Sequence, residues 1–333
     1  MRNQIGSIHY IYINELIQMD KKELTQVLKS LGIKSVNDGV GTGSRWIKSS
    51  GKEIKSYSPV DGNLIARVTT CDPSAFEKVI SAAQQAFLKW RQVAPGDRAK
   101  LLRNFATVID SHIEELAKLE VLNSGHTIGN ARWEAGNVRD VLNYYSATPE
   151  RLFGRQIPVP NGIDITFKEP LGVIGVIVPW NFPMPIAGWG FAPALASGNT
   201  VVLKPAEVTP LTAIRIGELA LEAGIPEGVL NIIPGKGSVV GERFVSNPKV
   251  RKIVFTGSTE VGKKIMRGCS DQVKRLTLEL GGKSANVIFA DSDLEKAAAS
   301  APGSVFDNAG QDCCARSRLL IERSAFDKFM PLF

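Results

Sequence analysis

The chain has 333 residues, of which 44% are hydrophobic and 22% are charged, a composition typical of a soluble globular protein. Its net charge of +7 is scattered along the sequence, which argues against nucleic-acid binding, because such proteins gather basic residues into one stripe. Four cysteines and three histidines are too few for a disulfide scaffold or a zinc cluster. They favour a reducing, cytoplasmic location and no metal.

The N-terminal segment contains an apolar stretch from Ile8 to Ile13, which Asn14 and Glu15 interrupt. This stretch is too short for a signal peptide or a membrane span. We therefore expect no membrane contact, and we expect residues 1–20 to be a disordered extension.

Two amphipathic helices are predicted next. Asp72 suits the N-cap of the first and Pro73 its first position, and apolar residues from Phe76 to Phe87 recur at helical spacing. A second helix is expected after Pro95-Gly96-Asp97, with apolar residues at helical spacing through Leu119. Both are predicted to pack in a core and to carry no chemistry.

The sequence between Arg151 and Glu169 changes character. Glycines and prolines separate short alternating runs such as 163–167, which predicts strands or a hairpin. From Val173 onward, apolar strands of four to six residues alternate with single helices up to the helix that begins near Val261. This alternation predicts an α/β fold with a doubly wound parallel sheet.

A first candidate site follows the strand 251–255. The segment from Thr256 to Gly262 joins this strand to a helix, so backbone N–H groups and the helix dipole would face an anion there. A Gly/Ser turn before a helix also occurs for structural reasons, and no GxGxxG motif is present. A phosphate site and a purely structural turn both remain open.

A second candidate is Glu279, which lies in the apolar run 276–280 directly before two glycines. If it were buried without a nearby cation, its pKa would rise and it could act as a general base near neutral pH. The alternative is a structural glutamate with a partner.

A third candidate is the pair Cys313-Cys314, which follows a flexible Ala-Gly step and precedes the strand 318–321. A cysteine on a tight turn can be a nucleophile if its thiolate is stabilised and exposed. Adjacent cysteines can equally be small buried apolar residues.

Taken together, five motifs in this order resemble the aldehyde dehydrogenase superfamily, from about Lys55 to the last residue. The motifs are Val178-Pro179-Trp180-Asn181-Phe182-Pro183, Lys204-Pro205-Ala206-Glu207, Phe255-Thr256-Gly257-Ser258-Thr259, Leu278-Glu279-Leu280-Gly281-Gly282-Lys283 and Gly310-Gln311-Asp312-Cys313. The interval from Glu279 to Cys313 also resembles the family's spacing between general base and nucleophile.

The resemblance implies a Rossmann-like cofactor domain followed by the beginning of a second α/β catalytic domain. Residues 21–150 would be the N-terminal part of the cofactor domain, 151–169 an oligomerisation hairpin, 170–279 the NAD-binding core, and 280–333 an incomplete catalytic domain. The cofactor implied is NAD, with NADP as an alternative. The residues implied to contact it are Val178, Trp180, Lys204, Glu207, Gly237, Gly241, Thr256, Gly257, Ser258, Val261 and Leu280.

The resemblance also implies the chemistry. Cys313 would attack an aldehyde, the thiohemiacetal would pass hydride to the nicotinamide, and Glu279 would activate the water that hydrolyses the thioester. Asn181 would join the Cys313 backbone N–H in an oxyanion hole. The aldehyde would contact Phe182, Trp189, Asp312 and Cys314. Asp312 would oppose thiolate formation if it faced the sulfur, so we expect its side chain to point away.

The chain ends at Phe333, before the family's Glu-x-Phe-Gly-Pro segment and its C-terminal assembly strand. We therefore expect a truncated, weakly active or inactive form. The resemblance implies a homo-oligomer for the intact parent, and we expect assembly to be impaired in this chain. Two other hypotheses remain: a non-catalytic nucleotide-binding fragment, and an acylating enzyme that uses coenzyme A, against which Glu279 argues.

Overall fold

The computed structural model describes residues 21–43 and 45–333, so the expected extension at residues 1–20 lies outside the described residues. The chain divides into two compact units. The larger unit runs to Phe255 and includes Ile265–Thr277, and the smaller unit comprises Thr256–Lys264 and Leu278–Phe333. Each unit is described by itself below.

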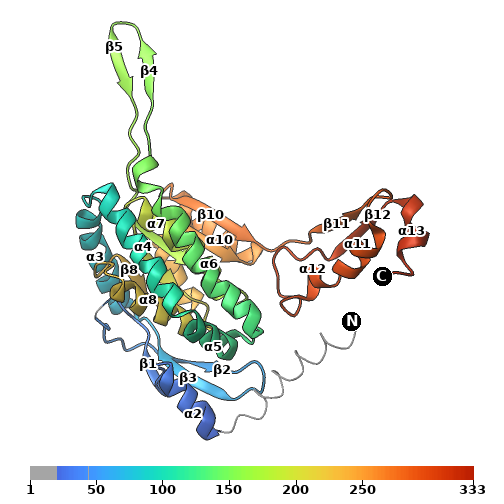
Figure 1. The fold of residues 1–333 in the computed structure, drawn as a ribbon. Coiled ribbons are helices and arrows are strands. Elements are labelled where there is room, and N and C mark those ends of the chain that lie inside the picture. The colour runs from blue at the N-terminus through green and yellow to red at the C-terminus, as the bar shows by residue number, and fades with distance from the viewer. Residues whose placement is uncertain (1–20, 44) are drawn as a thin grey trace. The chain divides into compact units, whose positions relative to one another are not determined.

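A five-stranded sheet forms the centre of the larger unit (Figure 1). Its strands, in the order β10-β9-β6-β7-β8, are β10 (Arg275–Leu280), β9 (Val250–Gly257), β6 (Val173–Ile177), β7 (Thr200–Lys204) and β8 (Leu230–Ile232). The pairs β6·β7, β6·β9 and β7·β8 are parallel. Every residue of β6, β7 and β8 is buried, which is typical of a parallel sheet covered on both faces. The predicted doubly wound fold is confirmed.

Neighbouring residues of β6 show which helices cover each face of this sheet. A Cβ at Gly175 would lie 3.1 Å from the ring of Phe244, whereas Val176 packs against Gly190. Because successive strand residues point to opposite faces, α9 (Glu242–Ser246) covers one face and α7 (Pro183–Ala196) covers the other. Phe76 of α3 (Pro73–Trp90) contacts Phe244 edge to face, so α3 lies on the α9 side.

Further helices build a layer outside α7. Figure 1 shows α4, α6 and α7 packed side by side. These outer helices are α4 (Pro95–Ser111), α5 (Ile113–Ser124) and α6 (Ile128–Ser146). Helix α8 (Leu211–Glu222) packs directly on the sheet, where a Cβ at Gly217 would lie 2.7 Å from Ile232 of β8. Short helical turns also occur at Pro149–Arg151 and Gly237–Gly241. α7 is apolar around its whole circumference because it lies between the sheet and this layer.

The second predicted helix is in fact two helices. The backbone at His112 leaves the helical region (φ −113°, ψ 14°) and separates α4 from α5. The prediction of one continuous helix through Leu119 is therefore wrong. The apolar spacing continues across the break because both helices bury residues in the same core.

Near the N-terminus, a small sheet that was not predicted has the order β1-β3-β2. Its strands are β1 (Val36–Asp38), β2 (Glu53–Tyr57) and β3 (Leu64–Thr69), preceded by α2 (Lys21–Ser30). Burial alternates in β1 over only three residues, and β3 has two consecutive buried positions, which is why the sequence pattern of this sheet is weak.

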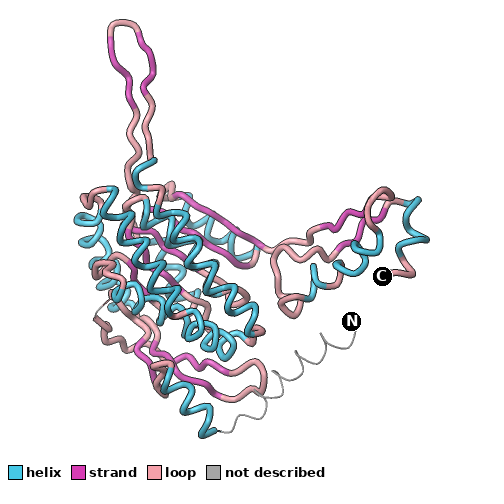
Figure 2. The backbone as a smooth tube through the Cα atoms, viewed as in Figure 1, coloured by secondary structure: helices cyan, strands magenta, loops and turns pink. Residues whose placement is uncertain are grey.

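The predicted hairpin at 151–169 is confirmed. It consists of β4 (Gln156–Val159) and β5 (Gly162–Ile165), joined by Pro160 and by Asn161 in the left-handed region (φ 57°). Figure 2 shows it extending away from the helices and sheet of the larger unit. All eight residues of its two strands are exposed.

The smaller unit contains a two-stranded parallel sheet of β11 (Ala285–Ile288) and β12 (Arg318–Ile321). Its helices are α11 (Leu294–Ser300), α12 (Gly303–Phe306) and α13 (Arg323–Phe329). Ile288, Ala298 and Phe329 form its core. Helix α10 (Thr259–Ser270) begins in this unit. Among the described residues of the whole chain, no helix is long and apolar enough to cross a membrane.

Candidate active site

Cys313 lies in the smaller unit, on the loop between α12 and β12. The loop turns at Ala309 (φ 52°) and Gly310 (φ 75°), two consecutive residues in the left-handed region. Such a conformation is strained for alanine and easy for glycine. The turn leaves both Cys313 and Cys314 exposed, whereas Cys71 and Cys269 are buried in the larger unit. The thiols of this loop are therefore accessible to a substrate.

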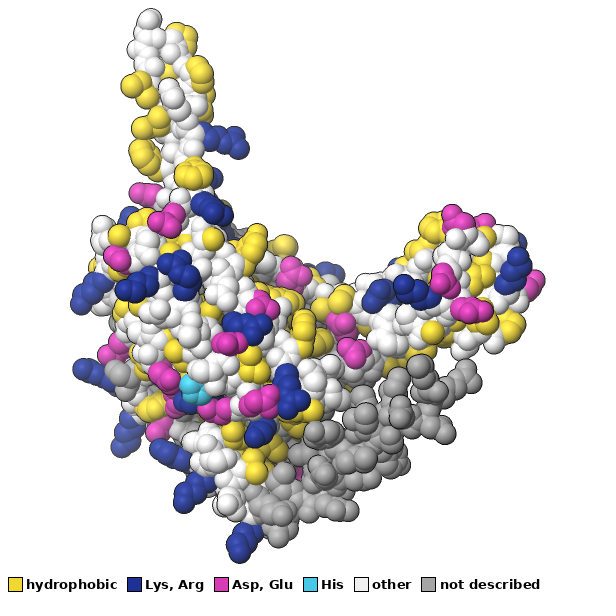
Figure 3. Space-filling model, viewed as in Figure 1, with side chains coloured by type: hydrophobic (Ala, Val, Ile, Leu, Met, Phe, Trp, Pro, Cys, Tyr) yellow, Lys and Arg dark blue, Asp and Glu magenta, His cyan; other side chains and the backbone are white. Residues whose placement is uncertain are grey.

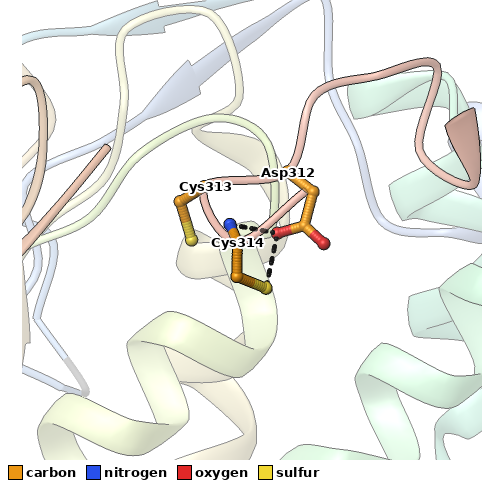
Figure 4. A group of neighbouring side chains, drawn as sticks. All are labelled: Asp312, Cys313 and Cys314. Carbon is orange, nitrogen blue, oxygen red and sulfur yellow. Dashed lines mark hydrogen bonds between the residues drawn. The ribbon is translucent and has the colours of Figure 1, made fainter. Parts of the chain in front are cut away.

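The Asp312 side chain faces these thiols (Figure 4). Its Oδ1 accepts hydrogen bonds from the backbone N–H and the Sγ of Cys314, each at 3.1 Å. One of its oxygens and both cysteine sulfurs lie within 4.8 Å of one another. The expectation that Asp312 points away is therefore wrong, because its carboxylate caps the Cys314 N–H and completes the tight turn.

This arrangement disfavours both thiolates. Partial burial, followed by the charge of Asp312, raises the pKa of the Cys313 thiol above its usual value. The hydrogen bond to Asp312 is the main cause that raises the pKa of Cys314 to about 11. A carboxylate beside a thiol repels the thiolate. The Cys313 backbone and the Cys314 side chain oppose the rise in the Cys313 pKa but do not outweigh it, so a thiolate at Cys313 needs further stabilisation.

Glu279 lies in the same unit, near the end of β10. Three residues later, Gly282 lies against the cysteine loop, with its Cβ position 3.6 Å from the backbone oxygen of Cys313. The side chain of Glu279 is exposed. The expectation that it is buried in an apolar strand end is wrong, because the side chains of β10 on that face have no covering layer among the described residues of the smaller unit.

The predicted phosphate-facing turn surrounds the start of α10. Thr256 and Gly257 end β9, and Ser258 Oγ accepts a hydrogen bond from the Val261 N–H at 3.3 Å. Leu280 packs against Gly262, where a Cβ would lie 2.7 Å from its Cδ2. The structure thus places Thr256, Gly257, Ser258, Val261 and Leu280 around one helix N-terminus, which can bind an anion.

In the larger unit, Glu207 and Gly237 meet although they are far apart in the sequence. The Gly237 N–H donates to Glu207 Oε1 at 3.2 Å. A side chain at either Gly237 or Gly241 would have nothing within 4 Å among the described residues. The backbone there is open to a ligand beside a carboxylate.

Lys204 lies near Glu207 and is buried, with its Nζ donating to the Pro205 carbonyl at 3.1 Å. Burial lowers the pKa of Lys204 to about 8, and the charge of Glu207 opposes this shift. A buried ammonium with a single carbonyl acceptor keeps capacity to donate to hydroxyl or phosphate oxygens.

The segment that carries Asn181 connects β6 to α7. It is anchored at its start, where the Val178 N–H donates to the Lys204 carbonyl at 3.1 Å. Trp180 is exposed, and Phe182 is partly buried. The structure thus brings Val178, the start of the Pro-Trp-Asn-Phe segment, beside Lys204.

Three aromatic side chains lie over the same helices. Phe182 meets Trp133 edge to face with ring centroids 6.4 Å apart. The Trp189 Nε1 donates to Asn137 Oδ1 at 2.8 Å. Trp133 and Asn137, both on α6, were missed in the sequence, because their spacing on a helix resembles that of any surface positions. They place α6 beside the two predicted substrate residues Phe182 and Trp189.

A buried group of titratable residues lies beneath the Asn181 segment and was also missed. His126 Nδ1 is hydrogen-bonded to Glu134 Oε1, and the His126 ring meets Phe182 edge to face at 5.7 Å. Glu120 is buried near this pair, and burial, followed by the charge of Glu134, raises its pKa above the usual value. Nothing in a helical pattern distinguishes buried glutamates from exposed ones.

These observations were compared with known proteins. The model of the aldehyde dehydrogenase family matches residues 46–333. The chain belongs to the aldehyde dehydrogenase family. The resemblance found in the five motifs is thereby confirmed.

Relatives of this chain differ in the substrates that their names state. It is 43% identical over 298 residues to the cytosolic 10-formyltetrahydrofolate dehydrogenase of Homo sapiens, covering 86% of this chain and 33% of that protein. It is 38% identical over 321 residues to the mitochondrial succinate-semialdehyde dehydrogenase of Arabidopsis thaliana, covering 95% of this chain and 60% of that protein. The chain thus spans a third to three fifths of these relatives.

Among solved structures, it resembles a variant of the indole-3-acetaldehyde dehydrogenase AldA of P. syringae in complex with NAD+. The TM-score is 0.87 at 38% identity, with 93% of this chain and 64% of that chain covered. NAD(P) is the cofactor of the family. The carboxylate of Glu207, the buried Lys204 and the open backbone at Gly237 and Gly241 fit a ribose and its phosphates.

Proposed function

We propose that this chain oxidises an aldehyde to a carboxylic acid with NAD(P), by nucleophilic catalysis at Cys313. The observation that carries the proposal is the placement of Cys313. Its thiol is exposed on a tight loop, and its backbone lies 3.6 Å from the Cβ position of Gly282, close in sequence to Glu279. A nucleophile and a candidate base are thus carried by the same compact unit.

In the first step, the Cys313 thiolate forms a bond to the aldehyde carbon, and the electron pair of the carbonyl bond moves to the oxygen, which becomes negative. The Cys313 backbone N–H and the Asn181 amide would donate to this oxygen. When bound, NAD(P) supplies the hydride acceptor that the oxidation requires. The alkoxide then collapses to a thioester on Cys313.

In the second step, Glu279 takes a proton from water, and the water oxygen attacks the thioester carbon. The carbon–sulfur bond breaks, the acid leaves, and the thiolate is restored. An exposed Glu279 has access to water, which favours hydrolysis over transfer to coenzyme A. We propose that Phe182, Trp189, Asp312 and Cys314 contact the aldehyde.

A second candidate function is nucleotide binding without turnover. The observation that favours it is the Asp312 carboxylate beside both sulfurs, which raises the pKa of Cys313. The cofactor residues of the larger unit do not depend on that thiolate. Under this alternative the chain binds NAD, and Cys313 remains protonated.

NADH formation from NAD and a simple aldehyde separates the two candidates. The proposal expects NADH formation that Cys313→Ser reduces by more than about a hundredfold and that Glu279→Gln slows at the hydrolysis step. Glu295→Gln, which changes an exposed carboxylate of α11 in the same unit, is the matched control. Binding of NAD without any NADH would instead support the second candidate.

We also propose that the hairpin of β4 and β5 contacts a second copy of this chain. A two-stranded hairpin alone is marginally stable in water, and its exposed side chains are rich in apolar residues. Figure 3 shows hydrophobic side chains along the hairpin. These exposed residues include Ile157, Val159, Ile163, Ile165 and Phe167.

A further inference from the structure

Three titratable side chains are buried together in the larger unit, and the proposed chemistry does not use them. Glu120 of α5 and Glu134 of α6 are 0% exposed, and His126, between these helices, is 5% exposed. Among the described residues, neither carboxylate oxygen of Glu120 makes a hydrogen bond of good geometry. Only one of the two oxygens of Glu134 makes such a bond within the same part of the chain. Buried carboxylates without partners are costly. Apolar residues of similar size would serve the packing as well, so packing alone does not account for the group.

The group contacts the segment that carries Asn181 at several points. The Asn181 backbone lies near enough to the His126 ring to favour the charged form of the ring. The same ring packs edge to face against Phe182, with an interplanar angle of 61°. Burial raises the pKa of Glu134 above its usual value, and the Met184 backbone, in the first turn of α7, lies near enough to oppose this shift. The segment 181–184 therefore lies against one buried pair, His126 and Glu134, and its firmest contact is the packing of Phe182 on the His126 ring.

We propose that His126 and Glu134 are positioning residues that fix the segment 181–184, and thereby the Asn181 amide, and that the protonation of the group sets how firmly they hold it. The role of Asn181 in the oxyanion hole rests on the proposed function, whereas the fixing of the segment does not. This assignment concerns residues that touch neither the aldehyde nor the cofactor.

The groups that face the two nitrogens of the His126 ring explain why its protonation matters. Its Nδ1 faces the Glu134 carboxylate, and its other nitrogen is left for the Asn181 backbone, where the interaction favours the charged ring. A carboxylate and a backbone carbonyl are both acceptors, and only the doubly protonated ring donates to both. If the pair of His126 and Glu134 loses one proton, the His126 ring keeps a single N–H donor. It can then donate to only one of its two acceptors.

The neighbours of the ring set the pH at which this happens. Burial lowers the pKa of His126, but the hydrogen bond and charge of Glu134 and the charge of Glu120 outweigh it, so the pKa is raised. Burial, followed by the charge of Glu134, raises the pKa of Glu120 to about 7, although the hydroxyls of Thr212 (α8) and Ser124 (α5) oppose this shift.

The pKa values of His126 and Glu120 are both raised in the folded state. A group whose pKa is raised in the folded state contributes stability below its unfolded pKa, and that contribution is lost as the pH rises through the raised value. The segment should therefore be held firmly near pH 6 and loosen as the pH rises above the ordinary histidine value of about 6.5.

Amide hydrogen exchange of the full chain, followed by NMR, tests the proposal without any aldehyde. We expect the protection factors of Asn181, Phe182 and Met184 to fall about tenfold or more in His126→Gln, as for the loss of a charge-assisted hydrogen bond. Amides of β7, such as Val202, should change less than about twofold. The matched control is His112→Gln, which changes a partly exposed histidine at the start of α5.

The pH profile distinguishes positioning from a merely structural role. In the wild-type chain, the Asn181 and Phe182 shifts should titrate with the same midpoint as the His126 ring, above about 6.5. Glu120→Gln removes a charge that raises the His126 pKa, so it should lower that midpoint while the segment stays protected near pH 6.

Three results would overturn the proposal. The first is that the protection factors of residues 181–184 do not change in His126→Gln, and the second is that protection factors fall equally throughout the core. The third is that Glu120→Gln does not change the pH midpoint of the His126 titration. If His126→Gln does not fold, the Glu120→Gln titration alone decides. Because none of these readouts requires turnover, an inactive chain that shows them would contradict the proposed function and leave this inference standing.

Discussion

Asp312 Oδ1 accepts hydrogen bonds from both the backbone N–H and the Sγ of Cys314, each at 3.1 Å. The carboxylate that closes this turn also raises the pKa of the neighbouring Cys313. The turn that exposes the Cys313 thiol therefore disfavours its thiolate. Substrate or cofactor groups must supply the compensating stabilisation of the thiolate.

Replacing this carboxylate should make the thiol more reactive. We expect Asp312→Asn to increase the rate of Cys313 alkylation by iodoacetamide near neutral pH by roughly three- to tenfold, because a neutral amide does not repel the thiolate. Asp307→Asn, an exposed aspartate in the same unit, is the control. An equal rate in the wild type and Asp312→Asn would show that the carboxylate does not govern the thiol.

The four cysteines should react with iodoacetamide in a definite order. Cys71 and Cys269 are buried, and burial raises the pKa of Cys71 to about 12. Cys314 donates its thiol hydrogen to Asp312. We therefore expect Cys313 first, then Cys314, then the buried pair, as read by mass spectrometry after partial alkylation. Uniform labelling would remove the basis for treating Cys313 as the nucleophile.

Cofactor preference depends on Glu207. Its carboxylate accepts from the Gly237 N–H, where it would also accept from ribose hydroxyls and repel a 2′-phosphate. We expect the chain to bind NAD more tightly than NADP, with only a moderate preference, because Lys204 can pair with that phosphate. Calorimetric titration of the wild type with both nucleotides checks this, and equal or tighter NADP binding would count against it.

A matched pair of variants isolates the carboxylate. Glu207→Gln should weaken NAD and strengthen NADP binding, each by roughly three- to tenfold. Glu222→Gln, an exposed glutamate at the end of α8 in the same unit, should change neither. If Glu207→Gln and Glu222→Gln change nucleotide binding equally, the change results from the overall charge of the protein and not from the Glu207 carboxylate.

The hairpin should cause weak, concentration-dependent self-association. Its strands expose Ile163 and Ile165 to solvent, and exposed apolar strand residues favour pairing with another chain. The double change Ile163→Glu and Ile165→Glu should lower the mass measured by light scattering and leave the thermal unfolding midpoint nearly unchanged. A monomer at all concentrations in the wild type would contradict the proposed contact.

Much of the fold follows from the sequence. The alternation of buried strands with helices predicts the parallel core of β6 to β9, and Asp72 with Pro73 marks the start of α3, where the Asp72 side chain accepts from the Ala75 N–H. These features are local or periodic, so the sequence carries them directly. The small sheet of β1 to β3 does not follow, because its strands are short and none shows a sustained alternation of buried and exposed residues.

Less of the candidate active site than of the fold can be predicted from the sequence. Motifs identify Cys313 and Glu279, but the direction of the Asp312 side chain depends on a hydrogen bond inside the turn, and the exposure of Glu279 depends on what covers β10. The buried group of Glu120, His126 and Glu134 leaves no sequence pattern, since it joins two helices and a loop. Side-chain partners that come from different elements are fixed by packing, which periodicity does not reveal.

The central claim is that Cys313 carries the acyl intermediate and Glu279 releases it. The most direct measurement is peptide mass spectrometry of the Glu279→Gln chain after incubation with NAD and a simple aldehyde. We predict an acyl group on Cys313 that forms only when NAD is present and that is lost on treatment with hydroxylamine. An acyl group on Cys314, or none on either cysteine in a chain that binds NAD, would contradict the claim.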